Sequence, residues 1–592
     1  APAAQSANDT TRFFESHPNE IDLKKESDRI LFANKHLGME FVKGEHSFEI
    51  NRLYSIDHDH DYLATEKANG SRELFEIRMT PDIRGSGRDR RGDSTKPSLM
   101  GIMDEMAADA FSVGTHSATT VSWKKSKSNG NTTLHLYWND IPVRNDQHLI
   151  DAEVTVTLRP GDPMSYWRIN VLNPDPGMKS GLERIRFPLL NIAPIGDAKD
   201  NVYIYPRGHG GYVEDPFNNS LGVNGYYPLH FNMQFNALYN KRSGTGLYLT
   251  TQDPVPNLMQ VQVANTPEHV TWKVAHFPPN ITFPQQSYCL PYDCVVGPFQ
   301  GDWYDAAQIY RKWALKQTWC RKGPLRTRAD SPKWYKESPF MFYTSIGDSA
   351  EGTHSLPENA RIAADHFREF LKWADMPLPA NWYSWKESVP GMSSYNVPFG
   401  SHRFYHQGRW AGMYPMNIHD GNYPKIGSLE AYVEENKKLR REGGMVCPYV
   451  ALEIFDQGPD ENSPYAQEAR PHVVRDLFGV KRMWSNETAW QMCVATDWWQ
   501  NRLEETCRIM TQREHLGGLY LDVMQGCGLP CYWTPHGHSA SGGDAITTGM
   551  HELVERCTTA AKTIDPEMII TGENITETVS YTHLTLPTIL LV

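Results

Sequence analysis

Gly517-Gly518-Leu519-Tyr520-Leu521-Asp522-Val523-Met524 is the stretch that decides how the second half of this chain folds. Its apolar residues predict a short buried strand, with Asp522 at the C-terminal end. An ionised carboxylate is costly to bury unless its charge is used. The pattern returns at Met568-Ile569-Ile570-Thr571-Gly572-Glu573. We therefore expect two neighbouring strands of a parallel barrel that bring Asp522 and Glu573 to face each other.

Strand and helix patterns alternate from residue 338 onward. Strands are expected at 340–346, 381–385, 445–451, 519–523 and 568–572, and helices at 358–373, after Ser428, after Thr496 and from about 544. This alternation is typical of a parallel (β/α)8 barrel, with a doubly wound open sheet as the alternative. No glycine-rich phosphate loop follows any strand, which weakens a nucleotide-binding version. We interpret 338–578 as a catalytic TIM-type barrel that is truncated after about five strands.

The preceding 12–300 segment has the pattern of an all-β domain. Val154, Val156 and Leu158 alternate with polar residues, as in a strand with one buried face. Turn clusters such as Asn129-Gly130 separate similar segments. Many short strands predict a large β-sandwich. The other segments of this kind are 133–138, 164–171, 201–205, 246–251 and 270–277.

The remaining segments are interpreted as connections and ends. Residues 301–337 are expected to form a linker, which begins with a helix capped by Asp302. The opening Ala1-Pro2-Ala3-Ala4 resembles the product of signal-peptide cleavage, so 1–11 is taken as a tail of a secreted or periplasmic protein; an arbitrary fragment end is the alternative. Residues 579–592, from Val579, resemble a translated sequencing adapter and are interpreted as non-native.

Composition excludes some classes of protein. The net charge of -12 argues against a nucleic-acid surface, and no apolar run approaches the ~18 residues that a membrane helix needs. The 17 Trp and 28 Tyr suit stacking on sugar rings. Among the nine Cys, Cys289/Cys294 and Cys527/Cys531 are close enough in sequence to form disulfides, with free thiols as the alternative. No cofactor is expected, and the oligomeric state is left open.

Asp522 and Glu573 are the candidate catalytic pair. Barrel enzymes carry their active sites at the C-terminal ends of the strands. Glycoside hydrolysis needs two carboxyl groups there, one to attack or stabilise the anomeric carbon and one to protonate the leaving oxygen. For each acid alone, a salt bridge or a helix cap is the alternative. Glu453, Asp456 and Glu577 are reserve acids.

Aromatic and histidine residues near the strand ends are candidate substrate contacts. His536 and His538 could hydrogen-bond sugar hydroxyls or bind a metal. A metallohydrolase would need further His ligands at other strand ends, and 340–346 has none. We therefore expect sugar contact and no metal site. The candidate stacking residues, for which core packing is the alternative, are Trp382, Trp385, Tyr449 and Trp533.

Six short motifs occur in a recognisable order: 232–235 (NMQF), 246–253 (GLYLTTQD), 492–496 (MCVAT), 520–522 (YLD), 536–538 (HGH) and 571–573 (TGE). This order resembles an uncharacterised bacterial glycoside-hydrolase-like family. Members have a galactose-mutarotase-like β-sandwich ahead of a TIM barrel, and the family is distantly similar to the endo-α-N-acetylgalactosaminidase family. The resemblance implies that Asp522 is the nucleophile and Glu573 the acid/base.

Together these observations predict a glycosidase that acts on oligo- or polysaccharides, with retention of anomeric configuration. A non-catalytic carbohydrate-binding protein on the same scaffold is the alternative, since a fold does not determine a function. A metal-dependent hydrolase built on His536 and His538 is a third, less favoured interpretation.

Overall fold

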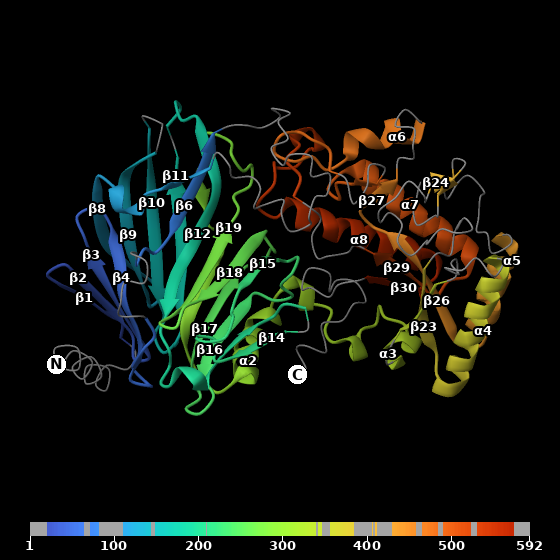
Figure 1. Ribbon diagram of the computed structural model, residues 1–592, viewed down its shortest axis with the longest axis horizontal. Coiled ribbons are helices and arrows are strands. Elements are labelled where there is room, and N and C mark those ends of the chain that lie inside the picture. Colours follow the sequence, from blue (N-terminus) through green and yellow to red (C-terminus); the bar gives the residue numbers. More distant parts are fainter. Residues whose placement is uncertain are drawn as a thin grey trace.

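Two parts lie side by side in the molecule, an antiparallel part from the first 300 residues and a parallel part from the rest (Figure 1). The computed structural model describes residues 20–63, 72–81, 110–143, 148–173, 175–208, 210–338, 341–345, 356–383, 405–406, 409–410, 429–456, 464–482, 489–522 and 530–572.

Three antiparallel sheets form the first part. One contains β1 (Asp22–Glu26), β2 (Arg29–Ala33), β3 (Leu37–Lys43), β4 (Phe48–Ser55) and β5 (His60–Asp61), in that order. The largest has the order β14 (Gly211–Glu214), β13 (Asn201–Tyr205), β16 (Phe235–Asn240), β17 (Thr245–Gln252), β21 (Asp293–Gln300), β11 (Ser165–Leu172), β10 (Leu149–Leu158), β9 (Asn131–Pro142) and β8 (Thr120–Ser128), with β20 (Tyr288–Cys289) also paired to β11. The third has the order β15 (Val223–Tyr227), β18 (Met259–Asn265), β19 (Val270–His276), β12 (Ser180–Ile192), β6 (Glu76–Pro81) and β7 (Phe111–Val113).

The three sheets share one apolar core, as in a β-sandwich. Trp138, Trp167 and Trp272 are among its largest fully buried side chains. The predicted alternation in β10 is confirmed, because every second residue along the strand is buried. The predicted turn at Asn129-Gly130 is also confirmed, since both residues have positive φ between the paired strands β8 and β9.

A capped helix follows the last strand of the sandwich at the predicted position. Helix α2 (Trp303–Ala314) begins after Asp302, whose carboxylate accepts a hydrogen bond from the Tyr304 N–H. Asp305 completes a capping box by accepting from the Asp302 N–H. The buried face of α2 packs on the ten-stranded sheet through Ala306 and Tyr310, so this helix belongs structurally to the sandwich.

The second part is built on five parallel strands. Their order is β22 (Phe342–Ser345), β23 (Leu378–Tyr383), β26 (Gly444–Ala451), β29 (Gly518–Asp522) and β30 (Ile569–Gly572). The helices between them are α4 (Leu356–Ala374), α5 (Leu429–Arg441), α7 (Asp497–Glu514) and α8 (Ala545–Ile564). The five predicted strands and the helices between them are confirmed, although β23 begins three residues earlier than expected. That these strands form a TIM-type barrel truncated after about five strands remains a prediction.

Several short elements were not predicted. They are α3 (Lys333–Glu337), α6 (Pro464–Ala469), the hairpin of β24 (Tyr405–His406) and β25 (Arg409–Trp410), and the hairpin of β27 (Ile454–Asp456) and β28 (Ala489–Gln491).

Two glycines let β29 lie deep in the parallel sheet. A Cβ on Gly517 would stand 2.4 Å from the Met445 Cβ, and one on Gly518 would stand 2.5 Å from Ile569. Side chains at both positions would push β29 away from β26 and β30. The glycine pair at the start of the strand thus allows the close packing that places Asp522 at its far end.

The segment 530–544 joins the parallel part to the sandwich. Backbone hydrogen bonds link Gly543 to both Phe277 (2.8 Å) and Leu258 (2.9 Å). The Ile281 N–H donates to the Ala540 carbonyl at 3.0 Å. Around these bonds lies an apolar cluster shared by both parts: Tyr226, Leu258, Ala275, Phe277, Ile281, Leu477 and Tyr532.

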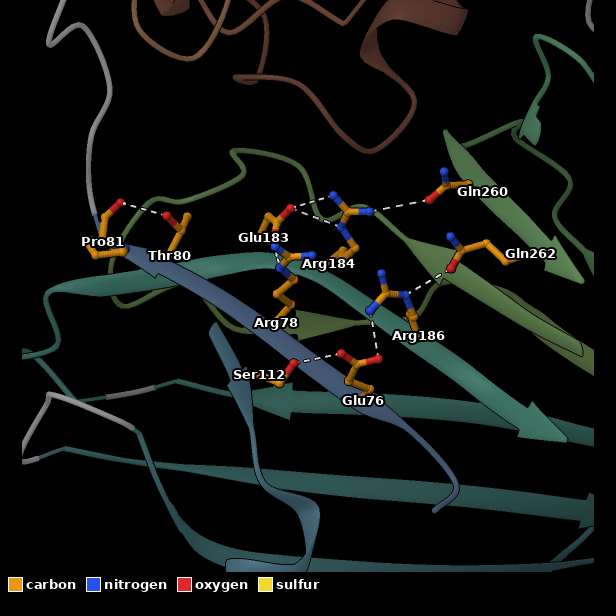
Figure 2. Close-up of polar contacts among 10 residues, drawn as sticks. All are labelled: Glu76, Arg78, Thr80, Pro81, Ser112, Glu183, Arg184, Arg186, Gln260 and Gln262. Carbon is orange, nitrogen blue, oxygen red and sulfur yellow. Dashed lines mark hydrogen bonds and ion pairs between the residues drawn. The ribbon is translucent and has the colours of Figure 1, made fainter. Parts of the chain in front are cut away.

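Charged side chains form a layer on one face of the six-stranded sheet (Figure 2). Arg184 is 2% exposed and donates to Glu183, which is fully buried, and to Gln260. The Arg184 guanidinium also lies 5.4 Å from the centre of the Phe277 ring. Arg186 bonds Glu76 on β6 and Gln262 on β18, so it connects three strands of this face. Paired in this way, the charges are tolerated at low exposure.

The described cysteines are free thiols. Cys289 is exposed and Cys294 is buried, so the first of the two candidate disulfides is absent. Cys527 of the second candidate pair lies outside the described residues. No helix in the described part of the chain is both long enough and apolar enough to cross a membrane.

Candidate functional site

Asp522 ends β29 at the C-terminal edge of the parallel sheet. Its residue is 8% exposed, and its Oδ2 accepts a hydrogen bond from the Tyr449 hydroxyl on β26. The backbone is fixed as well, because the Leu452 N–H donates to the Asp522 carbonyl at 3.0 Å. A carboxylate held by a neighbouring strand at this edge has little freedom to move.

The second candidate acid cannot be placed in the same way. Strand β30 pairs with β29, and its last residue, Gly572, lies opposite Leu521. Glu573 is the next residue in the sequence and lies outside the described residues. The same is true of Trp385 and Glu577.

Two further candidates are described only by their backbone. Trp382 lies in β23, opposite Thr344 of β22 and Pro448 of β26. Asp456 ends β27.

Tyr449 is nearly buried, at 4% exposure, and its ring stacks on Tyr520 with centroids 5.8 Å apart. The ring therefore packs within the fold, and the hydroxyl is the group that reaches Asp522.

Glu453, a reserve acid, is buried just beyond β26. Burial raises the pKa of its carboxyl well above the ordinary value, and a hydrogen bond from the Gln491 amide offsets this only in part. Burial therefore favours the neutral form of this carboxyl. Because the Met492 N–H also donates to its backbone carbonyl at 2.7 Å, Glu453 ties the end of β26 to β28.

A pocket of about 540 Å³ opens beside the loops that follow β28 and β29. Its walls include Trp498, which stacks on His472 with ring planes 4° apart and centroids 4.9 Å apart. Trp533 forms another wall, with the Arg475 guanidinium 4.7 Å from its ring centre. Burial, with His536 as a smaller cause, lowers the pKa of His472 and keeps it neutral. Flat aromatic walls beside neutral and cationic donors suit a polar ring-shaped ligand.

Only some of the residues that were predicted to contact the substrate line this pocket. Trp533 and His536 line the pocket. Asp522 and Tyr449 are not among its lining residues, so the described residues leave the pocket and the carboxylate as two separate features.

Two cysteines and two histidines form a compact cluster next to the pocket. One ligand atom from each of Cys493, Cys531, His536 and His538 lies within 4.8 Å of the other three. Cys493 Sγ is 3.2 Å from His538 Nε2, and Cys531 Sγ is 3.3 Å from His536 Nδ1. Burial raises the pKa of the Cys493 thiol. Burial also acts to raise the pKa of Cys531, but hydrogen bonds from Cys493 and both histidines outweigh it and lower that pKa well below its ordinary value.

Cys493 is the member of this cluster that sequence reasoning missed. It follows β28, whereas the other three lie together in 530–544, in a Cys-x4-His-x-His spacing. That spacing was a signal for three of the four residues. The fourth is 38 positions upstream of Cys531, and only the fold brings it near.

The chain matches a family described as "Domain of unknown function (DUF6259)" over residues 288–401 and 395–581. A protein of Monosiga brevicollis named "Putative glycoside hydrolase 22789" is 24% identical over 429 residues, which are 69% of this chain and 34% of that protein. A Bacteroides thetaiotaomicron protein named "Putative glycoside hydrolase" is 23% identical over 417 residues, 67% of this chain and 53% of its own length. The chain thus spans about a third to a half of these relatives.

Among solved structures, the α-N-acetylgalactosaminidase NagBb of Bifidobacterium bifidum, in complex with GalNAc, is similar with a TM-score of 0.61 at 10% identity. The similarity covers 95% of this chain and 77% of that one. At this identity the likeness shows a shared fold, which extends over both the sandwich and the parallel part.

Proposed function

We propose that the chain is a glycoside hydrolase that cleaves oligo- or polysaccharides by a retaining, two-carboxylate mechanism. The observation that carries the proposal is Asp522, held by the Tyr449 hydroxyl at the C-terminal end of a central parallel strand. The names of both curated relatives and of the solved structure with the same fold support glycoside hydrolysis as the reaction. In this proposal Asp522 is the nucleophile and Glu573, on the neighbouring strand-end segment, is the acid/base.

The mechanism assigns each group one task. Asp522 attacks the anomeric carbon while Glu573 gives its proton to the leaving oxygen, and a glycosyl ester forms as the glycosidic bond breaks. Water, deprotonated by Glu573, then hydrolyses the ester and frees Asp522. Retention requires the two carboxyl groups to lie ~5–5.5 Å apart. Tyr449 is a positioning residue, because its hydroxyl touches Asp522.

The test compares the chain with its Asp522→Asn and Glu573→Gln variants on a panel of aryl glycosides. The panel includes an aryl glycoside of GalNAc. Each variant is expected to lose activity on the order of 10²–10⁴-fold or more, while the exposed Glu268→Gln control retains it.

Tyr449→Phe should lower kcat ~10–100-fold with KM unchanged, as expected for one lost hydrogen bond to a charged group. Sugar binding without turnover in all of these proteins would refute the proposal and favour a carbohydrate-binding protein.

A further inference from the structure

We propose that Cys493, Cys531, His536 and His538 form a closed, four-coordinate zinc site. One sulfur or nitrogen atom from each residue converges within 4.8 Å of the others. Two thiolates and two imidazoles are a ligand set that structural Zn²⁺ sites use. The site would hold the loops around the pocket in place and take no part in bond cleavage.

The hydrogen bonds of the two rings orient them as ligands. His536 Nε2 lies 2.7 Å from the Pro471 carbonyl, and His538 Nδ1 lies 2.7 Å from the Ser539 carbonyl. A carbonyl oxygen only accepts, so each of these nitrogens must carry a hydrogen. The other nitrogen of each neutral ring then presents its lone pair toward a cysteine sulfur. Metal-bound histidines show this arrangement, in which the second nitrogen donates to a backbone carbonyl.

The distances suit a tetrahedral zinc ion. Zn–S and Zn–N bonds of about 2.3 Å and 2.0–2.1 Å place sulfur and nitrogen ligands roughly 3.5 Å apart. The two closest sulfur–nitrogen pairs, at 3.2 and 3.3 Å, need to separate by only a few tenths of an ångström. Two thiolates would also balance the charge of Zn²⁺, which makes a neutral centre suitable for burial. Binding would release the thiol protons to solvent.

The number of ligands separates a structural role from a catalytic one. A catalytic zinc keeps one coordination position for water or substrate, whereas four protein ligands close the site. The ion would connect the segment after β28, through Cys493, to the 530–544 segment. His536 extends the link to Pro471, so the site connects three segments, each of which contributes residues to the pocket wall.

The first experiment measures metal in the full chain. The protein is purified under reducing conditions without a polyhistidine tag, exposed to zinc chloride, and passed through a desalting column. We expect about one zinc per chain, bound by two sulfur and two nitrogen atoms at about 2.3 and 2.0–2.1 Å in the X-ray absorption spectrum. No retained zinc, or zinc bound by nitrogen and oxygen alone, overturns the proposal.

Variants locate the ion. Cys531→Ser and Cys493→Ser should each reduce the zinc content to near none, whereas Cys289→Ser removes an exposed cysteine of the sandwich and should leave it at one. Should a variant fail to fold, Co²⁺ replacement in the wild-type chain decides: thiolate-to-cobalt absorption supports the site and its absence refutes it. Zinc content is read without any glycosidase assay, so the result is independent of the proposed function.

A disulfide is the competing fate of the two thiols. Peptide mapping of unreduced protein detects a Cys493–Cys531 bond directly. If reduction of such protein restores binding of one zinc, the metal site stands; if the reduced protein takes up none, the pair is a disulfide site and the proposal fails.

Discussion

Asp253 shows how a single buried carboxylate makes the fold sensitive to pH. It follows β17 and is 1% exposed. Its oxygens accept bonds from the Asn257 N–H at 2.6 Å and from the Val255 N–H at 3.1 Å. Burial outweighs these donors and raises the pKa of Asp253 to about 7, with Asp544 of the other part as a smaller cause in the same direction.

The direction of the pH effect follows from this shift. Between the unfolded and folded pKa values the folded chain holds a proton that the unfolded chain has released, so stability falls as pH rises toward 7. Wild type should lose roughly 3 kcal/mol between pH 5 and pH 8 relative to Asp253→Asn, which cannot titrate. Urea unfolding of both proteins at the two pH values measures the difference. Parallel pH profiles would contradict the predicted titration of Asp253.

Residue roles were the part of the site least visible in the sequence. Asp522 was identified because a charge interrupts an apolar run, and the fold places it at a strand end as expected. Tyr449 is a candidate for stacking on sugar from the sequence, with core packing as the alternative. Its burial and its bond to Asp522 depend on strand pairing that no local pattern shows. The Cys493 contact with His538 is of the same kind, because it depends on a long-range approach of two loops.

At the scale of the elements, the segment 530–544 combines several structural roles. It contains three of the four proposed zinc ligands, part of the pocket wall and the backbone bonds to the sandwich. Gly542 lies where it meets the sandwich, with φ of +67°, and a Cβ there would be 1.9 Å from the Pro278 carbonyl oxygen.

Gly542→Ala should therefore destabilise the molecule by two mechanisms, strained backbone and a clash with a backbone atom. We expect a loss of ~2–4 kcal/mol. Gly130→Ala is the matched control, since Gly130 also has positive φ but has open space around it; its cost should be ~1–2 kcal/mol. Equal losses in urea unfolding would mean that the contact with Pro278 contributes nothing.

Element positions were largely predictable, for physical reasons that can be stated. Buried strands such as β29 and amphipathic helices such as α8 leave local apolar patterns. Strand β23 begins earlier than predicted, and its first residues include Pro379, although proline is disfavoured in a central strand. The two-residue strands β24 and β25 are too short to leave any pattern.

At the scale of the whole molecule, the two parts share a small apolar interface centred on Tyr532. This side chain is 5% exposed and packs with Phe277 and Ile281 of the sandwich. Such an interface makes each part depend on the other for burial of its apolar surface.

Tyr532→Ala should weaken that dependence. Truncating a large buried aromatic side chain lowers the free energy of unfolding by ~3–5 kcal/mol. Here the lost contacts are those between the two parts. Differential scanning calorimetry is expected to show one transition separating into two. Tyr304→Ala, at a residue 45% exposed on α2, should leave the profile unchanged. A uniformly shifted single transition in Tyr532→Ala would mean that the parts unfold as one unit.

The position of β21 in the ten-stranded sheet has a consequence for synthesis. β21 lies between β17 and β11, so it joins the group from β8 to β11 to the group from β13 to β17. It is also the last strand of that sheet to be translated. At ~5–20 residues per second, β11 waits on the order of ten seconds for this partner. During that time one side of β11 offers unpaired backbone groups, and a nascent chain stalled before residue 293 would present that edge to chaperones or to other chains.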